Sequence, residues 1–509
     1  MWIAVLLLAL VASGFAVVRQ THMFQLNSYS PATHWPWLAK HRTYWLPSVV
    51  VLLVGLLSLV WSGASHAAVV CLLVAVAVNW PRPGAKKPLV YTSRVVRMLV
   101  TVAVLAVALA VAAVLAPADV RTLVATLSFV LCPIWVVLAN TVNAPIEAAV
   151  RRHYLNDAKR LLASHPGLTV IGVTGSYGKT SVKYYLTTLL KGRFNVLMTP
   201  ESYNTPMGIT KTIRAELRAT HEIFVCEMGA KRVGEIKEDC DLVHPSIGII
   251  TAIGEQHLET FGSQANILAT KLELAEAVRG RGAVYLNGDN QILRANLPDQ
   301  ERQMYGLRTD NDTFAYDIGV TLAGSRFSIN HRGRQLTGLA TPLIGSHTIQ
   351  NLAGAIAVAL DLGLSEAELR AQLRKLEPAP HRLALSRQGA VTIIDDAYNS
   401  NPAGAKAALD TLALFDATKI LITPGMVELG PRQEALNEEF GVQAAVCDHV
   451  FLVGAKQTEP IARGLAKAGF DPAKLTVVAD VNQAISQAHA LPGAGDKVIL
   501  LENDLPDNY

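Results

Sequence analysis

The feature that most constrains the fold is the stretch from Leu168 to Leu190, LTVIGVTGSYGKTSVKYYLTTLL. A short apolar run rich in β-branched residues predicts a buried strand, and a segment with helical periodicity follows it. A glycine turn at 175–178 joins the two. This order is typical of a phosphate-binding loop, because glycine lets the backbone approach an anion and the first N–H groups of the helix point towards it.

The turn and the start of the helix also carry the side chains that a nucleotide site needs. Lys179 supplies a mobile cation for the outer phosphates, and a hydroxyl at Thr180 or Ser181 can hold Mg²⁺. The general nucleotide pattern has a glycine where Val173 stands, so the motif here is the shorter form Thr-Gly-x-x-Gly-Lys-Thr. The sequence therefore predicts an ATP site made by Gly175, Ser176, Tyr177, Gly178, Lys179, Thr180 and Ser181.

The first 145 residues predict a membrane region. Of the 509 residues 51% are hydrophobic and only 17% are charged, and the apolar excess lies before residue 145. A bilayer core is about 30 Å thick, which a helix of roughly 20 apolar residues crosses. Five transmembrane helices are therefore predicted, at about 2–18, 45–61, 64–80, 99–116 and 123–142. The alternative that the first is a cleaved signal peptide is weaker, because no basic region precedes it.

The distribution of basic residues predicts the orientation of these helices. Loops 19–44 and 81–98 are rich in Lys and Arg, and Arg151, Arg152, Lys159 and Arg160 follow the last stretch. Basic loops stay in the cytosol, so the N-terminus is expected outside and everything after residue 145 inside. An ATP site after residue 145 agrees with this orientation. We expect a multi-pass protein of a bacterial inner membrane with cytoplasmic catalytic domains.

Several classes of function are disfavoured by what the sequence lacks. None of the five apolar stretches has an Asp, Glu, Lys or Arg near its middle, so an ion path is not favoured and an anchor is expected. The net charge of +4 and the absence of basic runs interleaved with aromatics give no support for a nucleic-acid partner. The five cysteines show no CxxC spacing, which argues against a zinc ribbon.

Polar residues follow two further predicted strands of the soluble part. Glu227 follows the apolar run 222–226, and His257 lies in the loop after the run 245–251. Open α/β sheets bind ligands beyond the carboxyl ends of their strands, and a carboxylate and an imidazole near a triphosphate suit Mg²⁺. A helical segment at 263–278, which contains Lys271, comes next.

A second α/β domain is predicted after a hinge at 378–382. Strands at about 391–396, 419–423, 449–453, 475–479 and 497–501 alternate with helical stretches at 402–415, 431–447, 456–468 and 481–490. This alternation is typical of a doubly wound parallel sheet. Asp396 closes the first of these strands, where an acid commonly meets a ribose hydroxyl.

Seven motifs in order resemble the Mur ligase family, which joins amino acids or peptides to cell-wall precursors at the expense of ATP. They are TGSYGKTS, CEMGAKRVGEI, GEQHLETFGS, TKLE, GSHTIQN, HR and DDAYNSNP. The similarity is greatest to the subgroup that adds D-alanyl-D-alanine to the muramoyl tripeptide. It implies an α/β enzyme with a central P-loop domain at 150–381 and a Rossmann-like domain at 382–509. These domains follow the membrane region at 1–145 that the apolar stretches predict.

The resemblance implies a role for each matching residue. Gly175, Gly178, Lys179 and Thr180 would hold the triphosphate, and Glu227 would bind a Mg²⁺ shared with the phosphates. His257 would hold a second Mg²⁺, and Lys271 would carry a carbamate beside that metal. Asn351, with His347 near it, would face adenine, Arg382 would reach the phosphates and Asp396 would bind ribose. Asn204 and Gly208 match the family's substrate-side loop.

The sequence departs from the family in two places, which leaves the substrate open. The domain that grips the UDP end of the precursor has no counterpart, and the apolar stretches take its place. An acidic tail from Glu502 stands where a basic, glycine-containing segment is expected. The acyl donor could be the muramoyl tripeptide, with D-Ala-D-Ala as the incoming amine. It could instead be a lipid-linked precursor or an envelope polymer such as poly-γ-glutamate.

Two other classes of function agree less well with the sequence than a ligase does. A P-loop ATPase that drives transport through its own helices would require a signature such as LSGGQ and polar spans, and neither is present. A catalytically inactive scaffold would have lost Lys179, Glu227 or Lys271, and all three are present.

Overall fold

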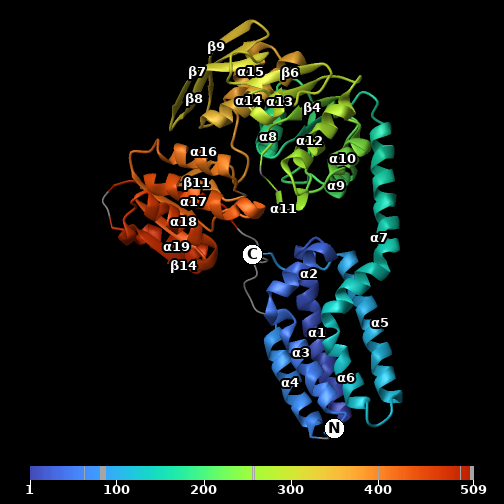
Figure 1. Cartoon of the computed structure of the whole chain (residues 1–509). Coiled ribbons are helices and arrows are strands. Elements are labelled where there is room, and N and C mark those ends of the chain that lie inside the picture. The colour runs from blue at the N-terminus through green and yellow to red at the C-terminus, as the bar shows by residue number, and fades with distance from the viewer. Residues whose placement is uncertain are drawn as a thin grey trace. The chain divides into compact units, whose positions relative to one another are not determined.

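The structure is a computed structural model that describes residues 1–61, 63–80, 87–254, 256, 258–398, 400–492 and 495–504, apart from the side chains of Glu259 and Lys456. The chain divides into two compact units, Met1–Arg152 and a second that begins at His153 (Figure 1). The predicted residue His257 lies outside the described residues.

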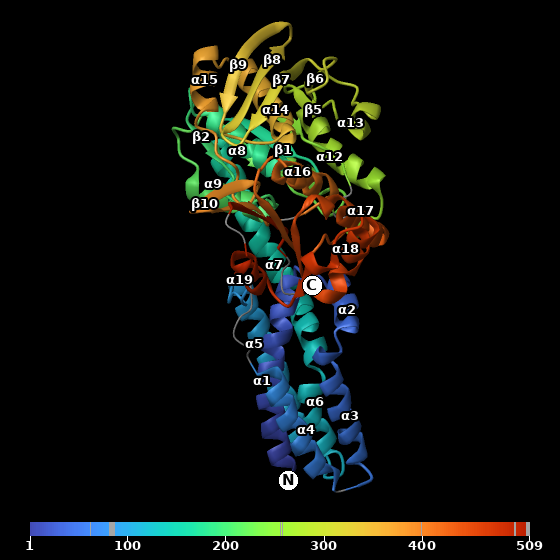
Figure 2. The same cartoon turned by 90° about the vertical axis from the view of Figure 1, so that its left-hand side faces the viewer.

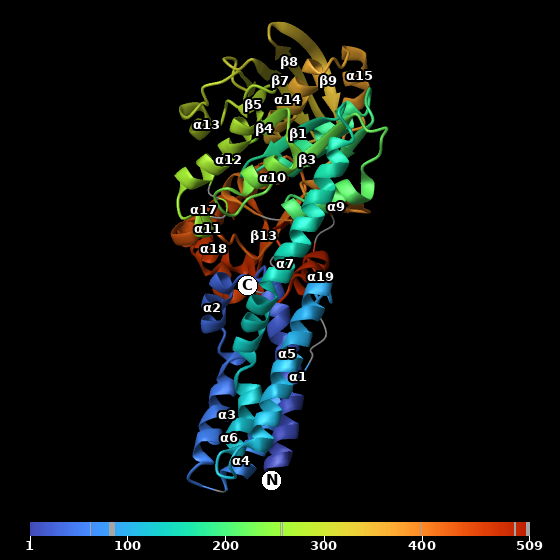
Figure 3. The same ribbon diagram turned by 90° about the vertical axis from the view of Figure 1, so that its right-hand side faces the viewer.

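The first unit is helical. Its core includes Phe24, Leu72, Met98 and Phe129, all fully buried or nearly so. Its helices are α1 (Trp2–Leu26), α2 (Pro31–Lys40), α3 (Leu46–Leu57), α4 (Ala64–Asn79), α5 (Ser93–Leu115), α6 (Arg121–Val130) and α7 (Cys132–Ala163), which is one helix in Figure 3 and continues into the second unit.

The prediction of five membrane-spanning helices is not confirmed. Among the described residues, only α1 and α5 are long and apolar enough to cross a membrane, and a third span exists if the bent pair α6 and α7 counts as one. Helices α3 and α4 have 12 and 16 residues. At 1.5 Å per residue they rise about 18 and 24 Å, which is less than a bilayer core.

The predicted span at 123–142 is broken at Leu131. Helix α6 ends at Val130, α7 begins at Cys132, and the two are bent by 66°. Pro133 follows the break, and proline removes a backbone donor and clashes with the preceding helical turn. Apolar composition therefore located this segment correctly and did not reveal that it is two helices.

The central domain is a mixed sheet of nine strands with helices on both faces. The strand order is β2-β3-β1-β4-β5-β6-β7-β8-β9, parallel from β2 to β7 and antiparallel in the β7–β9 meander, which Figure 2 shows at the sheet's far edge. The strands are β1 (Thr169–Thr174), β2 (Val196–Met198), β3 (Ile223–Glu227), β4 (Ile247–Ile250), β5 (Val284–Asn287), β6 (Arg302–Gly306), β7 (Thr313–Thr321), β8 (Gly324–His331) and β9 (Arg334–Thr341).

Side-chain alternation along the strands divides the core into two layers. On β1, Ile171 and Val173 pack in one layer and Val170 in the other, because successive side chains of a strand point to opposite faces. Helices α8 (Lys179–Leu190), α14 (Ser346–Asp361) and α15 (Glu366–Leu373) contribute to the first layer. The second includes α9 (Pro206–Glu216), α10 (Glu235–Val243), α11 (Leu258–Phe261), α12 (Gln264–Val278) and α13 (Gln291–Ala295).

The C-terminal domain is the doubly wound α/β domain that the sequence predicts. Its sheet order is β10-β11-β15-β12-β13-β14, parallel except for β10. The strands are β10 (Ala384–Gln388), β11 (Val391–Asp396), β12 (Thr418–Thr423), β13 (His449–Val453), β14 (Leu475–Val478) and β15 (Lys497–Glu502), and the helices are α16 (Pro402–Leu412), α17 (Gln433–Gln443), α18 (Ala455–Lys467) and α19 (Val481–Ala490). The five strands predicted here are confirmed to within one or two residues.

Candidate nucleotide site

The phosphate loop lies at the carboxyl end of β1 and leads into α8. Gly175 and Gly178 have φ of +148° and +80°, in the region that favours glycine. A Cβ on Gly175 would lie 2.1 Å from the Thr251 Oγ1, and one on Gly178 would lie 2.8 Å from the Asn351 Oδ1. Both glycines are therefore required by the backbone angle and by neighbours from other strands and helices.

The loop is fixed to the chain that follows β4. Ser176 N donates to the Ala252 carbonyl at 2.7 Å, and Gly254 N donates to the Ser176 Oγ at 3.0 Å. The Thr251 hydroxyl donates to the Tyr177 carbonyl. Since β1 and β4 pair in parallel, these contacts join two strand ends at the same edge of the sheet.

Lys179 begins α8 and turns back over the loop. Its Nζ donates to the Gly175 carbonyl at 2.8 Å and to the Ser176 carbonyl at 3.2 Å. Burial lowers the pKa of Lys179 to about 8, while Glu227 raises that pKa and Arg382 lowers it further. The ammonium is thus held where the phosphates of a nucleotide would enter.

A cavity of about 390 Å³ opens beside the loop. Of the residues predicted for ATP, all except Gly175 line it: Ser176, Tyr177, Gly178, Lys179, Thr180, Ser181, His347, Asn351, Arg382 and Asp396. The structure thus brings together residues from the phosphate loop, from α14 and from β11 around one space. A larger cavity of about 640 Å³ between α1 and α5 is lined almost entirely by apolar residues, so it has no groups to orient a nucleotide.

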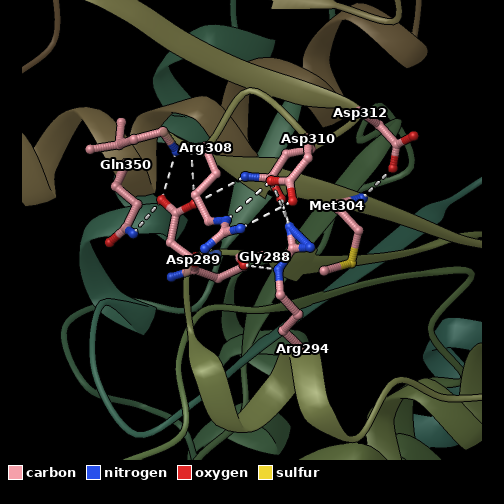
Figure 4. A network of polar contacts seen from close by, with 11 residues as sticks. Gly288, Asp289, Arg294, Met304, Arg308, Asp310, Asp312 and Gln350 are labelled. Carbon is pink, nitrogen blue, oxygen red and sulfur yellow. Dashed lines mark hydrogen bonds and ion pairs between the residues drawn. The ribbon is translucent and has the colours of Figure 1, made fainter.

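Residues at and just after the end of β5 complete the cavity and were missed in the sequence. Asn287, Asp289 and Asn290 line it together with Gln350. The carboxylate of Asp289 accepts from the Gln350 side chain at 2.7 Å and from the Leu307 amide at 2.6 Å, within the network shown in Figure 4. The rule that located Glu227, a polar residue at the end of an apolar strand, also applies to these residues.

His347 of α14 and Asp396 of β11 differ in electrostatics. Burial lowers the pKa of His347 to about 4, so the imidazole is neutral and suited to a neutral partner such as a base. Burial raises the pKa of Asp396 to about 6, although the Arg382 guanidinium opposes this shift. Arg382 stacks over the Tyr398 ring, with its guanidinium carbon 4.6 Å from the ring centroid.

Glu227 ends β3 opposite Val173 of β1, and its side chain is buried. Its Oε1 accepts from the Asn204 side chain at 3.0 Å, and its Oε2 forms an ion pair with the Lys183 ammonium at 3.1 Å. An ionised carboxylate has about four lone-pair sites, so these two contacts leave room for a hard cation on the same group. No group of three or more His, Cys, Asp or Glu forms a metal cluster within the described part of the chain. A Mg²⁺ here would therefore need the Thr180 hydroxyl and nucleotide phosphates as further ligands.

Lys271 projects from α12 and is almost fully buried. Burial lowers its pKa to about 7, and the charge of Lys179 lowers that pKa further. An amine that is half neutral near pH 7 can react with CO₂, so the residue fits a carbamate. Its Nζ lies 5.9 Å from the centroid of the Phe261 ring.

Of the two predicted substrate residues, Asn204 lies between β2 and α9 and Gly208 lies within α9. Asn204 contacts Glu227 as described, and its carbonyl accepts from the Gly229 amide at 2.7 Å. Gly208 lies in the first turn of α9, where its amide donates to the Thr205 hydroxyl at 3.3 Å. A Cβ on Gly208 would lie 3.1 Å from the Tyr203 Cα, so this glycine allows the loop to pack against the helix.

Family comparisons agree with this arrangement of domains. Residues 173–359 match the Mur ligase middle domain, and residues 381–501 match the Mur ligase glutamate ligase domain. The chain is 32% identical over 383 residues to the UDP-N-acetylmuramoyl-tripeptide–D-alanyl-D-alanine ligase of Mycobacterium tuberculosis (strain CDC 1551 / Oshkosh), covering 70% of this chain and 74% of the relative. A relative of the same name from Mycobacterium bovis, at 33% identity, is covered over 61% of its length.

Solved structures show the same fold. MurF from Acinetobacter baumannii superposes with a TM-score of 0.62 at 25% identity, covering 69% of this chain and 77% of that one. MurF ligase from Thermotoga maritima in complex with ADP gives a TM-score of 0.60 at 25% identity, covering 70% and 80%. The chain belongs to the Mur ligase family. It is an ATP-dependent ligase that forms carbon–nitrogen bonds, and its similarity is to the MurF type.

Proposed function

We propose that this enzyme forms an amide on a cell-wall precursor by MurF-like chemistry. The cavity beside the phosphate loop carries the proposal, because it joins Lys179, Asn351, Arg382 and Asp396 around a volume suited to a nucleotide. The likeness to a MurF ligase solved with ADP supports ATP as the nucleotide.

The proposed reaction has two steps. A substrate carboxylate oxygen attacks the γ-phosphorus of ATP, the bond to the bridging oxygen breaks, and an acyl phosphate and ADP result. The amine of the second substrate then attacks the acyl carbon, phosphate leaves, and the amine loses a proton. Lys179 and Arg382 would neutralise phosphate charge and hold the reacting atoms in line, which is the main contribution a protein makes to phosphoryl transfer.

Mg²⁺ fits the site through Thr180 and Glu227, and it would supply charge neutralisation at the phosphates. His257 is proposed as a second metal ligand and Lys271, as a carbamate, as its neighbour. The lowered pKa of Lys271, about 7, supports the carbamate, since only a neutral amine attacks CO₂.

The proposed substrates follow the relatives. The similar enzymes are named for a UDP-N-acetylmuramoyl tripeptide and D-alanyl-D-alanine, and we propose the same pair here. A lipid-linked precursor is the second candidate, because α1 and α5 are long and apolar enough to cross a membrane. For the same reason we propose a multi-pass anchor in a bacterial inner membrane, with the ligase domains on the cytoplasmic side.

The test is phosphate release by the full-length protein in detergent with ATP and Mg²⁺. UDP-muramoyl tripeptide with D-Ala-D-Ala is compared with the lipid-linked precursor with D-Ala-D-Ala, and with L-glutamate alone. Release with the first pair is the expected result. Release only with the lipid-linked substrate or with L-glutamate would replace the proposed substrate, and no release with any of them would contradict the assignment to cell-wall precursors.

A further inference from the structure

A lysine one turn into α8 is fully buried, although lysine is among the residues least often found inside a protein. The Lys183 side chain has no exposed surface, and its Nζ lies 3.1 Å from Oε2 of Glu227. It is three residues after Thr180, so the two share a face of the helix. Burying a charged lysine is costly unless it is paired, which calls for an explanation of its position.

The ammonium group of Lys183 joins two parts of the chain. Besides the ion pair with Glu227, its Nζ donates to the main-chain carbonyl of Glu201. Glu201 lies in the loop between β2 and α9, which we call the 199–204 loop, and has a φ of +43°. Lysine suits such a bridge because its ammonium group has three donors and can serve a carboxylate and a carbonyl together.

The same loop also reaches Glu227 from its other end. The Asn204 side chain donates to Oε1 of Glu227 at 3.0 Å, and the Glu227 amide donates to the Thr199 hydroxyl at 3.1 Å. Two contacts thus hold the Glu227 carboxylate and a third holds its backbone amide, and all three involve Lys183 or the 199–204 loop. No other cation contacts this carboxylate among the ion pairs of the described residues.

We propose that Lys183 is a positioning residue that clamps the 199–204 loop to the carboxylate of Glu227. The same ammonium thus orients the Glu227 oxygens and holds the 199–204 loop in place. It neutralises the buried carboxylate while no metal is bound, and the Glu201 carbonyl keeps the ammonium when a cation takes the carboxylate. The inference rests on the proposed function only in treating Glu227 as a metal ligand.

The test is hydrogen exchange of the full-length protein in detergent, free of nucleotide and treated with a chelator. Lys183→Met keeps the length of the side chain and its packing, and removes only the ammonium. The backbone amides of Tyr203 and Asn204 donate hydrogen bonds within the 199–204 loop. Their exchange rates should rise about tenfold, as expected for the loss of a hydrogen bond from a charged group. Exchange in the rest of α8 should be unchanged. Lys191→Met, an exposed lysine just after the same helix, is the matched control.

Two further variants keep the test decisive if Lys183→Met does not fold. Glu227→Gln keeps the ammonium and an acceptor, so the loop should stay protected. Lys183→Met with Glu227→Gln leaves no unpaired buried charge, and the loop should still exchange about tenfold faster because its link to the ammonium is lost. Wild-type exchange of the loop in the double variant would overturn the proposal. Since no ligation is measured, a failed ligase assay does not affect this result.

Discussion

Asp396 and Glu502 stand opposite each other on the paired parallel strands β11 and β15, and both carboxyl groups are buried. The Ser400 hydroxyl donates to Oε1 of Glu502 at 2.5 Å. Burial raises the pKa of both acids, that of Asp396 to about 6, and the charge of Asp396 raises the pKa of Glu502 further. Two such carboxyl groups do not ionise independently, so the protonation of Asp396, the proposed ribose ligand, depends on that of Glu502.

The first prediction concerns stability against pH. The folded-state pKa of Asp396, about 6, exceeds its ordinary value of 3.8, so the folded state binds more protons between these values and loses stability as pH rises through about 6. Glu502→Gln removes one acid and lets Ser400 keep an acceptor. We expect this variant to be more stable than wild type at pH 8 by about 1–3 kcal/mol, with a smaller gain at pH 5. Thermal unfolding of the full chain at both values measures this.

The control for that prediction is Asp410→Asn. Asp410 is exposed and pairs with Lys406 at 2.8 Å on the surface of α16. Exposed pairs contribute roughly 0–1 kcal/mol, so this variant should shift stability little at either pH. An equal pH response in Glu502→Gln and wild type would contradict the coupling of Asp396 and Glu502.

Lys179→Ala should abolish ATP-dependent phosphate release, by at least about a thousandfold, because the ammonium donates to two carbonyls of the proposed phosphate loop and would neutralise phosphate charge there. Binding of ADP, measured by calorimetry, should also weaken. Lys191→Ala, on an exposed site after the same helix, should behave as wild type. Retained ligation in Lys179→Ala would refute the assignment of the phosphate loop.

Lys271 should carry a carbamate whose amount depends on pH. With a pKa of about 7, the amine is largely protonated at pH 6 and largely neutral at pH 8, so the carbamate should increase over this range. Carbon-13 NMR of protein equilibrated with labelled bicarbonate measures it. The signal should disappear in Lys271→Ala, and formate should restore part of that variant's activity. Lys237, exposed and with its pKa raised by Asp241, is the internal control that should give no signal.

Much of the site was predictable because its residues follow directly from local pattern. A β-branched run, a glycine turn and Lys179 are contiguous, and strand ends in a parallel sheet converge at one edge. That rule predicted the position of Glu227 and of Asp396. It would also have found Asp289, which follows the strand β5 in the same way.

Other features could not be derived because they depend on contacts between distant segments or on helix ends. Lys183 contacts Glu201 and Glu227, which are 18 and 44 positions away in the sequence, so its proposed role is visible only in the folded chain. Periodicity alone assigns a lysine in an amphipathic helix to its solvated face. Likewise, apolar composition shows where the N-terminal helices lie and does not show where they end, which is why five spans were predicted.

The last prediction concerns the boundary between the two units. Within α7, Ala158 is fully buried in the core of the central domain, and Leu155 and Leu162 pack against that core. Asp157 accepts from the Arg214 Nε at 2.6 Å. A fragment that begins at Arg151 keeps these contacts and omits α1 to α6, so we expect it to be soluble and to bind MgADP. A fragment that begins at Ser164 loses the three apolar side chains and should be less stable by about 2–5 kcal/mol, which denaturant unfolding measures. Aggregation of the Arg151 fragment, or equal stability of the two, would show that this part of α7 does not belong to the ligase fold.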